Sequence, residues 1–130
     1  MRFVRHIGRT LLAPMFVSGG LDAFLDPASK VRKARAVTSP LASSLGMPDD
    51  PIALVRFNGG VQAIGGALLG LGAFTRLAAF TLAASLVPTT LAGHRFWEET
   101  DAEGRAAQRV QFFKNAAMLG GLVLLVADGG

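Results

Sequence analysis

Four long apolar stretches alternate with polar connections along the chain, at residues 8–25, 52–74, 77–94 and 110–127. Each is close to the ~17–25 residues that a helix needs to cross the hydrocarbon core of a bilayer. None carries the polar stripe that an amphipathic helix of a soluble protein shows. The pattern predicts an all-α fold, an integral membrane four-helix bundle, in a single domain over residues 1–130.

The two long connections, residues 26–51 and 94–109, lie at the same end of such a bundle, and both chain termini lie at the other. The first connection holds a basic cluster of Lys30, Arg32, Lys33 and Arg35. Small apolar residues between these charges fit a short amphipathic helix on the membrane surface. A solvated loop with a charge run fits equally well.

Short signals mark the ends of the predicted spans. Asp50 followed by Pro51 is typical of a helix start. Thr75 and Arg76 form a very short turn, which predicts an antiparallel hairpin of the second and third spans. Trp97 follows the third span, at the place of an interfacial anchor.

Composition supports a membrane protein over a Gly- and Ala-rich soluble bundle. Hydrophobic residues make up 51% of the chain and charged residues 17%, whereas soluble domains usually have about 25% charged residues. The chain has no cysteine, which excludes thiol and Cys–metal chemistry by this chain alone. The net charge of +4 favours anionic lipid headgroups over nucleic acid as the binding surface, and we expect no nucleic-acid partner.

Polar residues gather within or beside the spans, near the membrane face that carries the two long connections. Charged groups at this depth usually face inward and find partners, so Asp22 is expected to pair with Arg56 or Lys114. Two interpretations stay open: interfacial snorkelling with helix-tying hydrogen bonds, or a polar pocket for a small ligand, proton or partner. The cluster consists of Asp22, Arg56, Asn58, Gln62, His94, Lys114 and Asn115.

Small residues predict where helices approach closely. A G-x-x-x-G pair lies in the second span, and small-x-x-x-small pairs lie in the fourth, a pattern that lets helix backbones pack tightly in lipid. The predicted packing positions are Gly65, Gly66, Gly70, Gly120 and Gly121.

Catalytic and metal motifs are not evident. His94 has no companion at metal-ligand spacing, and neither a phosphate-binding glycine loop nor a nucleophile elbow occurs. The sequence therefore favours a non-catalytic protein over an enzyme, and we predict neither a metal site nor a cofactor, with a quinone as the alternative ligand.

Charge counts give conflicting orientations. Lys and Arg are more numerous in the two long connections, which favours placing these in the cytoplasm under the positive-inside rule. The first helix often dominates, however, and Arg2, Arg5 and Arg9 before it argue for the reverse.

Several motifs resemble the DoxX family of small bacterial membrane proteins. The motifs occur in the family's order over nearly the whole chain: Ser18 to Asp22, Gln62 to Gly66, Gly72 to Ala78, His94 to Trp97, and Gln111 to Asn115 followed by Gly120 and Gly121. Gln62 stands where many relatives carry Glu, so a proton-relay role is in doubt here while a structural hydrogen bond survives.

The resemblance implies a multi-pass protein of the bacterial plasma membrane. Some members are linked to membrane oxidoreductase complexes in redox-stress defence. We therefore expect a non-catalytic subunit or anchor of a membrane redox or respiratory-chain complex. The alternatives are a quinone- or lipid-binding oxidoreductase component, and a homo-oligomer packed through Gly66 and Gly70.

Overall fold

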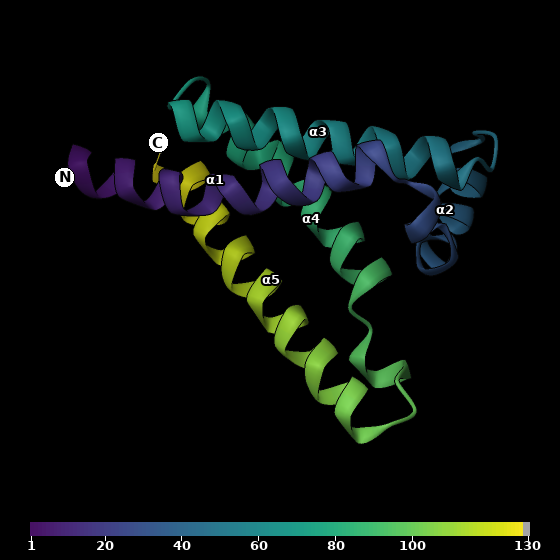
Figure 1. Cartoon of the computed structure of the whole chain (residues 1–130). Coiled ribbons are helices and arrows are strands. Elements are labelled where there is room, and N and C mark those ends of the chain that lie inside the picture. Colours follow the sequence, from purple (N-terminus) through teal and green to yellow (C-terminus); the bar gives the residue numbers. More distant parts are fainter. Residues whose placement is uncertain (129–130) are drawn as a thin grey trace.

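The computed structural model describes residues 1–128, which are almost entirely helical. Two short 3₁₀ turns, η1 (Ala28–Lys30) and η2 (Phe96–Glu98), lie in the connections. The long elements are α1 (Arg2–Leu25), α2 (Val31–Leu45), α3 (Pro51–Leu71), α4 (Thr75–Gly93) and α5 (Ala102–Asp128). The helices α1, α3, α4 and α5 alternate in direction, so the start of α1 and the end of α5 lie near one another (Figure 1).

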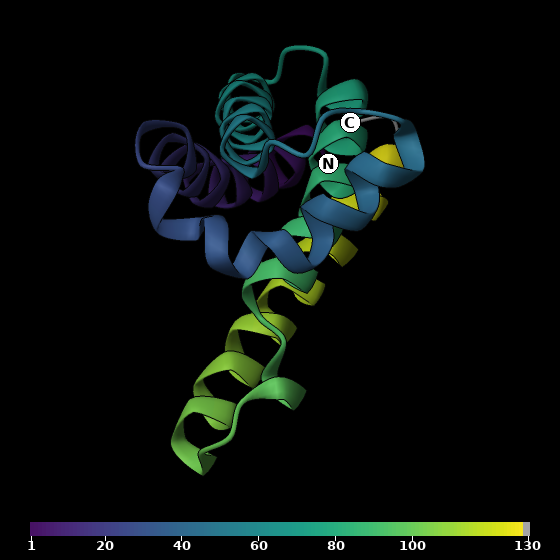
Figure 2. The same ribbon diagram turned by 90° about the vertical axis from the view of Figure 1, so that its right-hand side faces the viewer.

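The helices form two antiparallel pairs. α1 packs along α3, and α4 packs along α5, while α3 and α4 join the two pairs. In Figure 1 the pairs diverge toward the end that carries the long connections, like the arms of a V. α2 crosses at this end and packs against both α3 and α4 (Figure 2). The four long helices thus form a splayed bundle and not a parallel-sided one.

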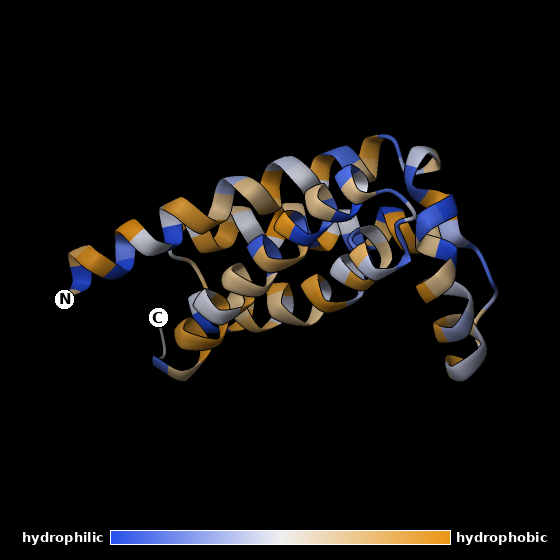
Figure 3. Ribbon diagram, turned by 90° about the horizontal axis from the view of Figure 1, so that it is seen from below, coloured by the Kyte–Doolittle hydropathy of each residue, from blue (hydrophilic) through white to orange (hydrophobic). Residues whose placement is uncertain are grey.

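Polarity is distributed as in a protein that faces lipid. Large apolar side chains such as Phe57, Phe80 and Leu124 are 72%, 61% and 70% exposed, respectively. Polar Gln62 and Asn115 are buried. Hydrophobic residues cover much of the long helices, and hydrophilic ones gather around α2 (Figure 3). Exposed apolar surface on this scale marks contact with lipid or a partner.

Three helical segments of the described chain are long and apolar enough to cross a membrane: Pro51–Leu71, Thr75–Glu98 and Ala102–Asp128. They correspond to the second, third and fourth predicted spans. α1 is not among them, because Arg2, Arg5, Arg9 and Asp22 lower its hydropathy.

The hairpin between α3 and α4 turns at residues 72–74, so the prediction of a turn at Thr75 and Arg76 is wrong. Gly72 has φ 75°, a conformation that glycine adopts without steric cost. The N–H of Ala73 donates to the carbonyl of Leu68 at 2.9 Å, which closes a glycine-terminated helix end. Thr75 is the first residue of α4.

The basic part of the first connection is helical, which settles the choice between a helix and a loop. α2 continues through Pro40, buries Ala34, Thr38 and Ala42 and leaves Arg32, Lys33 and Arg35 exposed. The next helix, α3, begins where the sequence predicts. Asp50 caps it by accepting a hydrogen bond from the N–H of Ala53 at 3.1 Å.

A backbone contact holds α1 against α3. A Cβ atom built on Gly20 would lie 2.5 Å from the carbonyl oxygen of Gly59 and 2.5 Å from the backbone nitrogen of Ala63. One built on Gly59 would lie 2.6 Å from the carbonyl oxygen of Gly20. Neither position has room for a side chain, so the two helices approach as closely as their backbones allow.

We predict that Gly20→Ala weakens the bundle, because the new methyl group meets backbone that cannot move aside. Overpacking of this kind typically costs about 1–3 kcal/mol. Unfolding in mixed detergent micelles measures it. Gly19→Ala is the matched control, since a Cβ there meets nothing within 4 Å. Equal effects of the two substitutions would contradict the close contact.

Candidate functional site

Four polar side chains join α3 to α4 in a hydrogen-bonded network. Asn58 Nδ2 donates to Thr89 Oγ1 at 2.7 Å. Gln62 Nε2 donates to the hydroxyl oxygens of Ser85 at 3.1 Å and Thr89 at 2.9 Å. Ser85 Oγ donates in turn to Asn58 Oδ1. Asn58 and Gln62 are four residues apart on α3, and Ser85 and Thr89 are four residues apart on α4. Each pair therefore lies on one face of its helix, and the two faces meet.

A second set of polar contacts joins α4 to α5. Asn115 Nδ2 donates to Thr90 Oγ1 at 3.0 Å. Nearer the connection, His94 Nδ1 lies 2.7 Å from Gln108 Oε1. α4 therefore has polar groups on two sides, one bonded to α3 and one bonded to α5.

These contacts satisfy the polar side chains buried between α3, α4 and α5, whereas Thr38 Oγ1 on α2 and Arg9 Nε on α1 are buried without a hydrogen-bond partner within residues 1–128. Gln62, Ser85 and Asn115 are all buried, and each has a partner on a neighbouring helix. A buried polar group without a partner is costly, and most of all in lipid. The network is therefore suited to fixing the register of α4 between α3 and α5.

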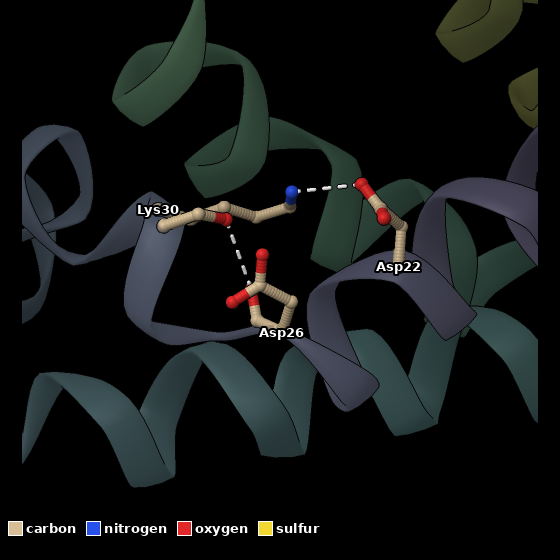
Figure 4. Close-up of polar contacts among 4 residues, drawn as sticks. Asp22, Asp26 and Lys30 are labelled. Carbon is tan, nitrogen blue, oxygen red and sulfur yellow. Dashed lines mark hydrogen bonds and ion pairs between the residues drawn. The ribbon is translucent and has the colours of Figure 1, made fainter.

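Asp22 does not make the pair expected of it. Its carboxylate Oδ2 lies 2.8 Å from Lys30 Nζ, eight residues on, and not against Arg56 or Lys114. Figure 4 shows this pair beside Asp26, whose backbone oxygen accepts from Ser29 Oγ at 3.1 Å. The reason is local: η1 folds back after α1 and brings Lys30 over the last turns of that helix. The pair is exposed, and exposed pairs contribute little to stability.

The other two expected cations also lie apart from the internal network. Arg56 Nε donates to the backbone oxygen of Phe24 at 3.2 Å, and its guanidinium carbon is 5.9 Å from the centre of the Phe24 ring. Lys114 Nζ donates to Gln111 Oε1 at 2.6 Å on the outside of α5. Four of the seven predicted residues make hydrogen bonds between helices, and three lie toward the surface. The first group is Asn58, Gln62, His94 and Asn115, and the second is Asp22, Arg56 and Lys114.

Four of the five predicted packing glycines face another helix of the same chain, and one does not. Cβ atoms on Gly66 and Gly70 would meet Phe16 at 2.9 Å and Ala13 at 3.0 Å, both on α1 of the same chain. The G-x-x-x-G pair therefore packs within the chain, and its place in a seam between copies is wrong. Gly65 faces Leu82 of α4, Gly121 faces Leu12 of α1, and a Cβ on Gly120 would meet nothing within 4 Å.

An aromatic cluster marks the junction between α4 and α5. The rings of Phe96 and Trp97 have centroids 5.2 Å apart, and the rings of Trp97 and Phe112 are 5.7 Å apart, in edge-to-face arrangements. Trp97 is 50% exposed. The position fits the interfacial anchor expected of Trp97, because aromatic side chains concentrate at membrane–water interfaces.

Sequence reasoning missed the partners on α4 and α5: Ser85, Thr89, Thr90 and Gln108. A signal for two of them is present. Ser85 and Thr89 are four residues apart, as are Asn58 and Gln62, and the two spans are joined by a short turn. Matching polar spacings in consecutive antiparallel helices would have indicated the network.

Across residues 1–128, no three His, Cys, Asp or Glu side chains come close enough together to hold a metal ion. The expectations about metals, cofactors and catalysis stay predictions.

The apolar exterior, the three segments able to cross a membrane and the polar contacts between them define a multi-pass helical membrane protein. Residues 4–95 match the DoxX family model, and the chain belongs to the DoxX family. The match covers α1 to α4, while the similarity at residues 111–121 lies beyond it. No curated protein and no solved structure matches the chain.

We predict that Gln62→Leu lowers the free energy of unfolding by about 1–2 kcal/mol, the upper range for interhelical hydrogen bonds in membrane proteins. Detergent unfolding measures it, with Gln111→Leu on the exposed face of α5 as the control. In a double-mutant cycle with Thr89→Val, the effects should be less than additive, because the two residues share a bond. Strict additivity would argue against the network.

Proposed function

We propose that this DoxX-family protein is a four-span, non-catalytic subunit or anchor that holds a redox or respiratory partner at the bacterial plasma membrane. One observation carries the proposal. The polar groups between α3, α4 and α5 are engaged with one another, whereas Arg32, Lys33 and Arg35 are exposed together on α2, at the end that bears the long connections. These exposed charged groups are available to bind a partner at that end, whereas the paired polar groups inside the bundle are less available to bind a substrate.

The fourth span in this proposal is α1. Its 24 residues make a helix of about 36 Å, which exceeds the ~30 Å hydrocarbon core. The backbone contact at Gly20 and Gly59 ties it along α3, itself apolar enough to span. An antiparallel helix bound so closely to a span would cross the membrane with it, its arginines reaching the far headgroups.

The docking surface would have two parts of opposite charge. Arg32, Lys33 and Arg35 are exposed on α2. The loop before α5 and its first turn carry exposed Glu98, Asp101 and Glu103. Complementary charges on a partner would set the orientation and the rate of docking more than the affinity.

A quinone- or lipid-binding oxidoreductase component remains the second candidate role. It is favoured by an apolar groove of about 730 Å³ between α3 and α4, a volume within the usual range of ligand sites, about 300–1,000 Å³. A homo-oligomer would have to use a surface other than the Gly66 and Gly70 face, which packs on α1.

We predict that mild-detergent extraction of the tagged protein from its native membrane recovers a redox or respiratory enzyme in a fixed ratio, identified by mass spectrometry. Arg32→Glu/Arg35→Glu should reduce that recovery, because it reverses charge on the exposed face of α2. Arg2→Glu/Arg76→Glu is the matched control, with two exposed arginines at the opposite end.

Thermal unfolding and membrane insertion of both double variants must equal those of the parent chain. A solitary parent protein, or equal loss of the partner in both variants, would contradict a docking surface at α2.

A further inference from the structure

An apolar groove lies on the outer face of the α3–α4 pair, away from the polar network. Its volume is about 730 Å³. α3 lines it from Ala53 to Leu68 and α4 from Leu77 to Thr81, and Phe24 of α1 closes one end. Gly60 and Gly65 lie in the groove wall, while Phe57 and Ile64 are 72% and 66% exposed. The lining is apolar except for Arg56 and Thr81.

Part of the groove is comparable in length to one leaflet of the bilayer. The helix from Ala53 to Leu68 is sixteen residues and about 24 Å long, and its stretch from Phe57 to Leu68 is about 18 Å long. One leaflet of the hydrocarbon core is about 15 Å thick, half of the ~30 Å total. An acyl chain lying beside the stretch from Phe57 to Leu68 would therefore extend through about one leaflet while its polar end reached the interface.

Arg56 places a positive charge at the interfacial end of this groove. It is exposed and lies in the second turn of α3. Its Nε donates to the backbone oxygen of Phe24. Among the ion pairs of residues 1–128, none involves Arg56.

Of the carboxylates near this end, those of Asp22 and Asp50 are engaged, whereas the Asp26 carboxylate makes no ion pair within residues 1–128. Asp22 pairs with Lys30 at 2.8 Å, and Asp50 caps α3 through the N–H of Ala53. The guanidinium of Arg56 thus has donors left for a ligand, and a phosphate group takes two parallel bonds from such a fork.

We propose that the groove holds one anionic phospholipid, with its phosphate on Arg56 and an acyl chain along α3 between Phe57 and Leu68. The phospholipid would cover exposed apolar surface and neutralise the only charge in the groove lining. A neutral quinone would leave that charge without a counter-ion. The inference does not depend on the proposed partner, because it concerns the isolated protein.

The test is native mass spectrometry of the protein released from detergent after purification from its own membrane, with identification of the lipid retained. Arg56→Gln removes the charge, and Arg32→Gln on exposed α2 is the matched control. Gly60→Leu fills the groove. A Cβ at Gly60 would meet only Phe24, at 3.5 Å, an ordinary contact. Gly120→Leu adds the same bulk outside the groove.

The parent chain should retain one anionic phospholipid, and Arg56→Gln should reduce its occupancy roughly tenfold, as expected for loss of a charge-assisted bond. Gly60→Leu should reduce it as well, and both controls should not. Arg56→Lys should recover part of the binding, which separates lost charge from lost folding. Equal retention in Arg56→Gln and Arg32→Gln, or retention of a quinone in place of phospholipid, would overturn the proposal.

Discussion

The close backbone contact between α1 and α3 is the constraint on which the rest of the structure depends. Gly20 and Gly59 leave no space for a side chain at their crossing. Gly66 extends the contact by packing on Phe16. On its own, α1 has a charged N-terminal third, and its hydropathy is lower than that of the three segments able to cross a membrane, in α3, α4 and α5. With this contact, α1 is held along α3, and the start of α1 and the end of α5 lie at one end of the bundle, where Arg5 pairs with Asp128 at 2.9 Å (Figure 1).

α4 links that rigid pair to α5 through polar groups on two of its sides. Ser85 and Thr89 bond to α3, and Thr90 bonds to Asn115 of α5. Bonds of this kind define register where apolar packing alone would let helices slide, because lipid competes for apolar surface as well as protein does. Since the polar groups between α3, α4 and α5 bond to one another, the recognition surfaces that we propose lie on the outside of the bundle, at α2, at the α4–α5 junction and in the groove beside Arg56.

The sequence predicts the helices more fully than their partners. Long apolar runs depend only on local composition, so three of the four predicted spans coincide with segments able to cross a membrane. The family assignment is likewise confirmed over residues 4–95. Pairings depend on how chain segments turn back: η1 brings Lys30 to Asp22, and Gly72 ends α3 before Phe74. Asp22 was expected to pair with Arg56 or Lys114 because all three lie toward the same face of the membrane. That shared position does not determine which side chains meet, because the local turn of the chain does.

The central claim, that α1 crosses the membrane with α3, is tested most directly by labelling single cysteines with a membrane-impermeant maleimide. The chain has no native cysteine, so the exposed positions Phe3, Ser44, Glu103 and Ala127 can each carry the only thiol. The account predicts that Phe3→Cys and Ala127→Cys label from one side of the membrane, and Ser44→Cys and Glu103→Cys from the other. Labelling of Phe3→Cys together with Ser44→Cys would contradict it, because α1 would then lie on one face of the membrane.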